Sequence, residues 1–153
     1  IKGGGPGDVH SYFNPLGSAL EAFTVYSSIL SDFEARVMLE LEKPEWVARR
    51  ILRPVAVERG FTFFYEFARP TQMTVYSLEE FSSALKTVDV ESIEFHSERG
   101  DFERWTRQVV GDNSLADRLK TAPNPRLKSE TLRKKIVSVV EQRIKELKTT
   151  AKT

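Results

Sequence analysis

The chain has 153 residues, 40% of them hydrophobic and 29% charged, values typical of one folded domain with extensions. Lys and Arg number 23 against 22 Asp and Glu, so the net charge of +1 excludes a uniformly basic nucleic-acid binder and an acidic disordered chain. The lack of cysteine excludes disulfides, thiolate catalysis and Cys-based metal sites, and no apolar run is long enough for a membrane span.

The first residues, IKGGGPGD, lack the apolar core of a signal peptide, so we expect a cytoplasmic protein. Asn and Gln are scarce, Cys is absent, and Glu, Lys and Arg are frequent, a composition that favours a thermophilic source. Residues 1–13 are rich in glycine and show neither helical nor strand periodicity, which predicts a flexible tail.

A helical N-terminal extension is predicted for residues 14–60. An Asn-Pro pair at residues 14–15 is a helix start, and the apolar residues that follow recur at spacings of three and four. The sequence does not decide where this helix ends, because residues 35–42 fit either a helix or a short strand. Pro44 then begins a second helix, which Pro54 ends.

Aromatic and β-branched residues alternate through GFTFFYEFARP, which predicts a strand from Phe61 to Phe67 that Pro70 stops. The segment from Gln72 to Tyr76 is the expected partner strand of an antiparallel hairpin. Because a two-stranded sheet is not stable alone, the hairpin must pack against helices.

The rest of the chain is predicted to be helical, which makes the fold class α+β: several short helices, a long C-terminal helix and a small antiparallel hairpin. Gly100 and Gly111 are expected to end the second and third helices of this region, and the last helix spans residues 130–148, before a basic tail at 149–153. Each helix begins at a residue whose side chain can accept a hydrogen bond from a free backbone N–H. These predicted starts are Ser77 in a capping box, Asp89, Asp101, Asn113 or Ser114, and Ser129.

Four motifs stand between the hairpin and the last helix: SLEEF at residues 77–81, SIEFH at 92–96, RGDFERW at 99–105 and GDNSLADRL at 111–119. In their order and spacing they resemble a prokaryotic family, found in archaea and bacteria, that is known only as a domain of unknown function. The resemblance covers residues 61 to about 147 and implies a mostly helical module, bounded here as residues 61–148, with no established activity. Its signature residues are His96, Arg99, Asp101, Phe102 and Trp105.

His96 and Asp101 are the candidates for acid–base chemistry. Metal binding is not expected, because Glu94 and Glu98 each lie two positions from His96 and face away from it on a helix. The competing interpretation is structural and is favoured: His96 ends one helix and bonds to Asp101 or to a backbone carbonyl, beside Trp105.

Positive charge is concentrated in the C-terminal segment. Residues 126–153 hold nine positive and three negative residues, a net charge of +6, which leaves −5 for residues 1–125 because the whole chain is +1. This segment is a candidate contact for RNA, a ribosome or an acidic partner. The competing interpretation is a solvated helix face, partly matched by acidic residues elsewhere. The candidate contacts are Arg126, Lys128, Lys134, Lys145 and Lys148.

The sequence contains no phosphate loop and no nucleophile or zinc motif. We therefore expect a non-enzymatic interaction or accessory module without a cofactor or metal. Its expected partners are another protein or a second copy of the chain, because the aromatic residues of the N-terminal extension are typical of interfaces, although they fit an intrachain core equally well. The alternatives are an RNA- or ribosome-associated protein and an enzyme centred on His96 and Asp101. No membrane contact is expected.

Overall fold

A computed structural model describes residues 28–29, 31–37, 43–124 and 126–152. The chain divides into two compact units, Ile1–Lys43 and Pro44–Thr153. In the first unit, residues 31–37 are helical. The predicted glycine-rich tail, most of the helix predicted from residue 14, and the part of the undecided segment after residue 37 lie outside the described residues.

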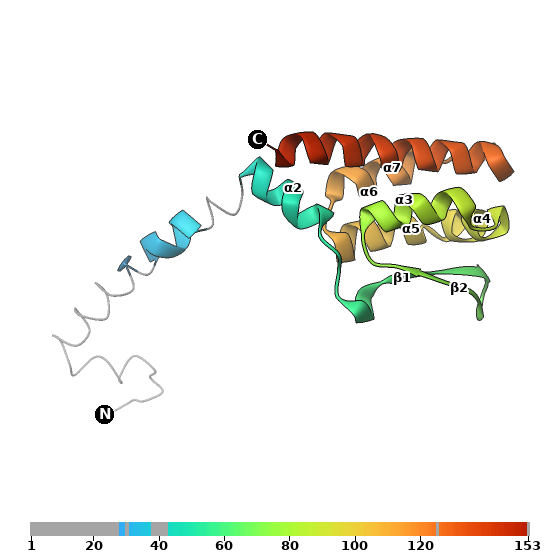
Figure 1. Ribbon diagram of the computed structural model, residues 1–153, viewed down its shortest axis with the longest axis horizontal. Coiled ribbons are helices and arrows are strands. Elements are labelled where there is room, and N and C mark those ends of the chain that lie inside the picture. The colour runs from blue at the N-terminus through green and yellow to red at the C-terminus, as the bar shows by residue number, and fades with distance from the viewer. Residues whose placement is uncertain (1–27, 30, 38–42, 125, 153) are drawn as a thin grey trace, which may run out of the picture. The chain divides into compact units, whose positions relative to one another are not determined.

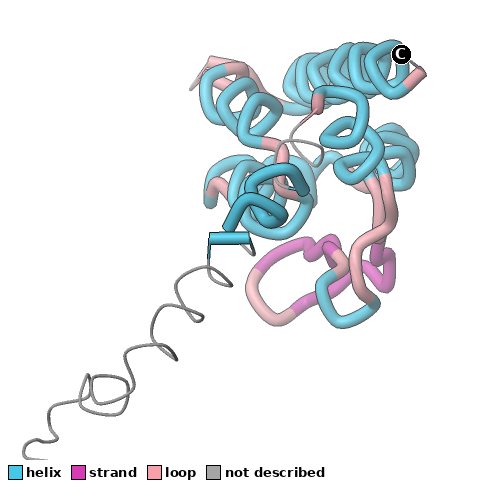
Figure 2. Tube along the Cα trace, turned by 90° about the vertical axis from the view of Figure 1, so that its left-hand side faces the viewer, coloured by secondary structure: helices cyan, strands magenta, loops and turns pink. Residues whose placement is uncertain are grey.

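The second unit is mostly helical and contains a two-stranded antiparallel sheet, which confirms the predicted α+β fold class. Figure 1 shows helix α7 along one side of this unit and the β1–β2 hairpin on the opposite side, with α3, α4 and α5 between them; in Figure 2 the C-terminus again lies at the top and the two strands at the bottom. In chain order the elements are α2 (Pro44–Leu52), the 3₁₀ turn η2 (Val57–Arg59), β1 (Phe61–Glu66), β2 (Arg69–Val75), α3 (Leu78–Thr87), α4 (Val90–Arg99), α5 (Asp101–Trp105), the π-helical segment η3 (Thr106–Val110), α6 (Asn113–Thr121) and α7 (Ser129–Ala151).

A stripe of apolar residues at helical spacing buries one face of α7, as the periodicity predicts. This face packs on α2, α3, α4 and α6. The helix runs past the predicted end at residue 148, and the Nε of Arg49 donates to the carbonyl of Ala151 at 3.1 Å. That bond satisfies one of the carbonyls that a helix end leaves free. The buried stripe is Leu132, Ile136, Val140, Ile144 and Leu147.

The predicted boundary of the hairpin at Pro70 is wrong. Strand β2 begins at Arg69, and Pro70 lies inside it, opposite Phe64. Proline is tolerated here because both strands of a two-stranded sheet are edge strands, and one side of each needs no N–H donor. The chain turns through Ala68, which has a φ of +64°, and the pairing is irregular on both sides of Phe64. The antiparallel pairing itself confirms the predicted hairpin.

The capping box predicted at the start of α3 is confirmed. The Oγ of Ser77 accepts the backbone N–H of Glu80 at 3.1 Å. In return, the carboxylate of Glu80 accepts the backbone N–H of Tyr76 at 2.7 Å, one residue before the usual partner. These two bonds fix the angle at which the chain leaves the hairpin and enters α3.

Other predicted caps are wrong. Asp89 stands at the cap position of α4 but makes no side-chain capping bond, and at the start of α7 the backbone N–H of Ser129 donates to a carboxylate oxygen of Glu94 at 2.7 Å. Helix α6 is capped by Asp112, whose Oδ1 accepts the backbone N–H of Leu115 at 3.2 Å, and not by the residues at 113–114. A carboxylate forms stronger hydrogen bonds than an amide or hydroxyl oxygen, so the aspartate takes the capping position.

Helix α2 belongs to the second unit, together with the hairpin and α3 to α7. It begins at Pro44 as predicted and packs on α7 and α3. Ala48 and Ile51 form its buried face, whereas Trp46 is 45% exposed. Residues 14–60, expected as one extension, are therefore divided between the two units.

The third helix of the C-terminal region changes its geometry halfway along. After α5, residues Thr106–Val110 are π-helical, and the backbone N–H groups of Gly111 and Asp112 both donate to the carbonyl of Thr106, at 2.9 and 3.0 Å. Gly111, with a φ of +85°, ends the segment as predicted, and Gly100 ends α4 in the same left-handed conformation. Short π-helical segments are frequent at functional sites.

Candidate functional site

Four of the five signature residues line one pocket of about 540 Å³ between the hairpin, α4, α5 and η3. A cavity of this volume is the size of typical small-ligand sites. Its walls come from segments that the sequence places more than 40 residues apart, since Phe61 and Gln108 both contribute. The lining residues used below are Phe61, Phe64 and Phe67 of the hairpin, Phe95, His96 and Arg99 of α4, and Asp101, Arg104 and Trp105 of α5.

His96 is 4% exposed, and both of its ring nitrogens are hydrogen-bonded. Nε2 accepts the backbone N–H of Phe64 at 2.8 Å, and Nδ1 lies 2.8 Å from Oδ2 of Asp101. Because a backbone N–H can only donate, Nε2 must carry the lone pair and Nδ1 the proton. Burial lowers the pKa of His96 below its ordinary value despite the opposing effect of Asp101, so the imidazole is neutral at pH 7.

The carboxylate of Asp101 accepts hydrogen bonds from three side chains. Oδ2 accepts from His96 and from the Nε of Arg99 at 2.9 Å, and Oδ1 accepts from Arg104. Burial alone would raise the pKa of Asp101, but the hydrogen bonds from His96 and Arg99 bring it below its ordinary value. The prediction that Asp101 caps α5 is wrong: Gly100 occupies the cap position, and these side-chain donors engage the carboxylate instead.

Arg99 and Arg104 form the polar edge of the pocket, and their side chains are 48% and 52% exposed. Both are tied to Asp101, and the guanidinium of Arg99 also lies 5.2 Å from the centre of the Phe95 ring. A cation over an aromatic face is attracted by the ring's quadrupole, which favours this position of Arg99. With His96 neutral, the two arginines and Asp101 carry a net charge of +1.

Phe102 and Trp105 are both buried, but they take different positions. Phe102 lies in the core, with its ring centre 5.5 Å from that of Phe61 and 5.4 Å from that of Phe81. Trp105 forms part of the pocket wall, and its Nε1 donates to the carbonyl of Arg59 at 2.9 Å. The indole nitrogen is therefore satisfied by the protein, and the ring offers an apolar surface to a ligand.

The geometry of this pocket is suited to binding. Since Nε2 of His96 is occupied by a backbone N–H and Nδ1 by Asp101, neither nitrogen is placed to take a proton from a ligand. Within the described ranges, no three His, Asp or Glu side chains gather closely enough to hold a metal ion. Among the described helices, none combines the length and the apolar character needed to cross a bilayer.

The five candidate contacts of the basic segment differ in whether they form ion pairs. Lys128 pairs with Glu98 at 3.3 Å, and Lys148 pairs with Glu79 of α3. These ion pairs join the positive C-terminal segment to the negative remainder of the chain. Arg126 is exposed on the loop before α7.

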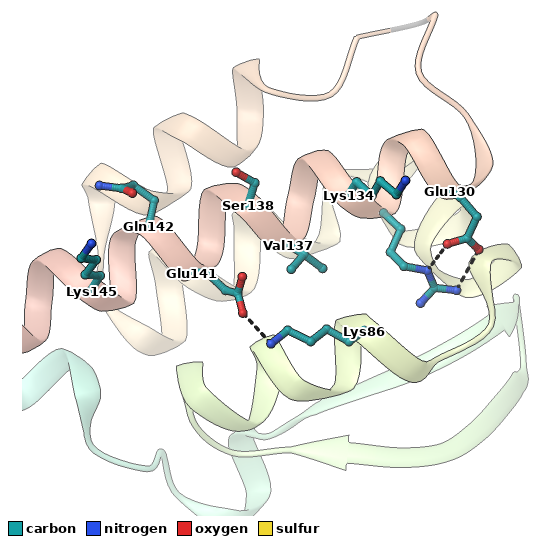
Figure 3. A pocket seen from close by; sticks show the side chains of 9 residues that line it. Lys86, Glu130, Lys134, Val137, Ser138, Glu141, Gln142 and Lys145 are labelled. Carbon is teal, nitrogen blue, oxygen red and sulfur yellow. Dashed lines mark hydrogen bonds and ion pairs between the residues drawn. The ribbon is translucent and has the colours of Figure 1, made fainter.

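Lys134 and Lys145 line a groove of about 520 Å³ beside α7 (Figure 3). Acidic residues share this groove: Glu141 pairs with Lys86 of α3 at 2.5 Å, and Glu130 pairs with an arginine one turn along α7. The groove is thus mixed in charge, and within the part of the chain that the structure describes Lys134 and Lys145 have no acidic partner.

Sequence reasoning missed the hairpin and Arg104 as parts of the site. A signal for the hairpin was present, because β1 has aromatic residues on both faces: Phe61 and Phe63 face the core, while Phe64 points to the other side. Phe61 and Phe64 both line the pocket, so aromatic residues from the two faces of β1 contribute to it. For Arg104, the spacing of three residues from Asp101 on one helix was the available signal.

The description "Family of unknown function (DUF5752)" belongs to a family model that matches residues 61–153, more than half of the chain and all of the pocket. No curated protein and no solved structure matches the chain.

Proposed function

The chain is a member of the DUF5752 family of unknown function, and we propose that it is a non-enzymatic interaction module whose pocket binds a protein partner. The main support for this proposal is that both ring nitrogens of His96 are already hydrogen-bonded within the protein. These two nitrogens hold β1, α4 and α5 together, so the groups left for a partner include the aromatic rings, the two arginines and the amide of Gln108. Aromatic residues and arginine are the types enriched at the centres of protein interfaces.

The rim of the pocket adds a second argument. Phe67, at the tip of the hairpin, is 81% exposed and lines the pocket mouth. A large apolar side chain held in water at the edge of an aromatic cavity loses that exposure when a partner binds, and each buried phenylalanine contributes about 1.5–3 kcal/mol. Phe67 is therefore the residue whose removal should weaken binding while leaving the fold intact.

Affinity capture from a lysate of the source cells tests this proposal, with the full chain and Phe67→Asp as baits and mass spectrometry as readout. We expect the full chain to retain a protein that Phe67→Asp loses. Val57→Asp is the matched control, because Val57 is 79% exposed but lies on η2, outside the pocket. Loss of the same protein with both variants, or with neither, would contradict the proposal.

A second candidate is RNA or ribosome association through the groove beside α7, supported by Lys134 and Lys145, for which the described residues offer no acidic partner. Such binding is electrostatic, so it weakens steeply with salt. A nuclease-treated arm of the capture experiment separates the two candidates. Under this second candidate the captured material disappears with nuclease and with the double variant Lys134→Glu, Lys145→Glu, and it persists with Phe67→Asp.

A second copy of the chain is one partner that the main proposal admits. Light scattering of the purified chain at high concentration tests it, because a dimer formed through the pocket is lost in Phe67→Asp and kept in Val57→Asp. The cytoplasmic location and the thermophilic source stay predictions from the sequence, and an archaeal origin is one of the two that the family resemblance implies.

A further inference from the structure

The pocket offers two kinds of chemistry side by side. One wall is aromatic and apolar, built from Phe61, Phe64, Phe95 and Trp105. The same pocket is lined by Arg99 and Arg104, both held by Asp101, and Arg99 lies beside Phe95 of the aromatic wall. A ligand that satisfies both must bring an apolar group and an anion within a volume of about 540 Å³.

Arg99 is oriented for an oxyanion. Its Nε donates to Oδ2 of Asp101, and its guanidinium carbon lies 5.2 Å from the centre of the Phe95 ring, so both contacts restrict the side chain. Within the described residues, its two terminal nitrogens make no hydrogen bond, so their N–H groups remain for a ligand. A planar pair of N–H donors matches the two oxygens of a carboxylate.

The charge of the site agrees with this geometry. The carboxylate of Asp101 is already bonded to three donors, and His96 is neutral, so one of the two guanidinium charges is not balanced inside the pocket. The positions of Arg99 and Arg104 are set before a ligand arrives, which reduces the entropy lost on binding. A ligand with a single negative charge is the one that balances the site.

We propose that the pocket takes the C-terminal residue of a partner polypeptide, with its α-carboxylate on Arg99 and its apolar side chain against the aromatic wall. This inference rests on the proposed function. In a C-terminal residue with an apolar side chain, the carboxylate and the apolar group share one carbon atom, so one residue supplies both within the pocket. An internal Asp or Glu brings the anion without an apolar group. Capture of a chain end by its carboxylate is a known mode of peptide recognition.

Fluorescence polarisation with the full chain and a labelled peptide tests the proposal. The probe is a fluorescein-labelled tetraglycine peptide that ends in phenylalanine with a free carboxylate, and its comparison is the same peptide as a C-terminal amide. We expect the amide to bind at least about tenfold more weakly, the loss that corresponds to one charge-assisted hydrogen bond. Equal binding of acid and amide would overturn the carboxylate assignment while leaving the pocket as the interaction site.

Two variants connect the effect to the pocket. Arg99→Gln should weaken the free-acid peptide about tenfold and leave the amide unchanged, whereas Arg50→Gln, an exposed arginine on α2 outside the pocket, should change neither. Circular dichroism checks that each variant is folded. Binding of N-acetylphenylalanine as tightly as the peptide would overturn the proposal in favour of a small carboxylate ligand. Absence of peptide binding, alongside Phe67-dependent capture of a protein, would overturn this inference and leave the proposed function in place.

Discussion

At the scale of single residues, His96 shows how one side chain joins three elements. Its Nε2 accepts from Phe64 in β1, its Nδ1 binds Asp101 in α5, and its own backbone belongs to α4. The Nε2 bond requires an unprotonated nitrogen, so protonation would replace a hydrogen bond with two donors facing each other. The charge state of this imidazole is therefore coupled to the folding of the unit.

Stability should fall as the pH is lowered below about 6.5. Burial lowers the pKa of His96 in the folded chain, so below the ordinary histidine value the unfolded chain binds the extra proton and gains stability relative to the folded one. The stability contributed by the neutral imidazole of His96 is fully present above the pKa that it has in the unfolded chain. It is lost as the pH falls toward the lower pKa of the folded chain. Urea unfolding at several pH values between 5 and 7.5 measures it.

The variant His96→Gln tests whether His96 causes this pH dependence of stability. We expect it to cost about 1–3 kcal/mol at pH 7, because a buried hydrogen-bond network is disturbed, and to flatten the stability profile between pH 5 and 7. A profile that keeps its slope in the variant would show that another group is responsible. His10 is the other histidine of the chain and lies outside the described residues.

At the scale of elements, Asp112 joins α6 to α7. Besides capping α6, the carboxylate of Asp112 forms a bidentate ion pair with Arg143. The Nε of Arg143 lies 2.8 Å from Oδ2, and its Nη2 lies 3.0 Å from Oδ1. Asp112 is 1% exposed, and the side chain of Arg143 is 19% exposed. A charge placed this deeply is tolerated only while its partner is present.

Asp112→Ala should destabilise the chain by more than the loss of a helix cap alone, which costs about 0.5–2 kcal/mol, because it also leaves Arg143 with only Glu146 at 3.3 Å as an acidic partner among the described residues. Asp117→Ala is the matched control on the same helix, since Asp117 is 71% exposed and pairs with Arg107 at the surface. Thermal and urea unfolding of both variants check the difference. Similar losses in the two variants would show that the buried pair adds nothing beyond a surface one.

Features set by neighbours in sequence were predicted well, and those set by distant residues were not. The capping box at Ser77, the stripe of α7 and the glycine helix ends depend on residues a few positions apart. The roles of Asp101 and Asp112 depend on other elements. Local spacing suggests that Asp101 is a helix cap, whereas its bonds to His96 and Arg104 determine its role. Local spacing suggests no role for Asp112, which pairs with the distant Arg143.

At the scale of the whole molecule, the same limit applies to the pocket. The signature residues were found in the sequence, but the aromatic wall that completes the site comes from the hairpin, and hydrophobic alternation does not reveal which helix a strand will face. The boundary of the folded unit also depends on contacts between residues far apart in the sequence. The family match begins at residue 61, whereas α2, which precedes it, packs on α7 and α3.

A chain of residues 44–153 should therefore fold as stably as the full chain, while residues 61–153 alone should not. Removing α2 exposes the surface that Ala48 and Ile51 cover, and loss of one buried isoleucine costs about 2–5 kcal/mol. Urea unfolding followed by circular dichroism compares the two fragments with the full chain. Equal stability of the two fragments would show that α2 is dispensable for the fold.

The π-helical turn at Thr106–Val110 also bears on how the length of this chain can vary among its relatives. Each residue of an α-helix turns the chain by about 100°, so an insertion within a helix normally rotates every side chain that follows. Here Gly111 ends the helix directly after the wide turn, and α6 starts afresh from the cap at Asp112. An added or deleted residue at η3 would shift Gln108 and Val109, which line the pocket, and also the buried Thr106 and Val110. A change of length at this turn would therefore alter the shape of the pocket without changing the rotation of α6, which starts from its own cap.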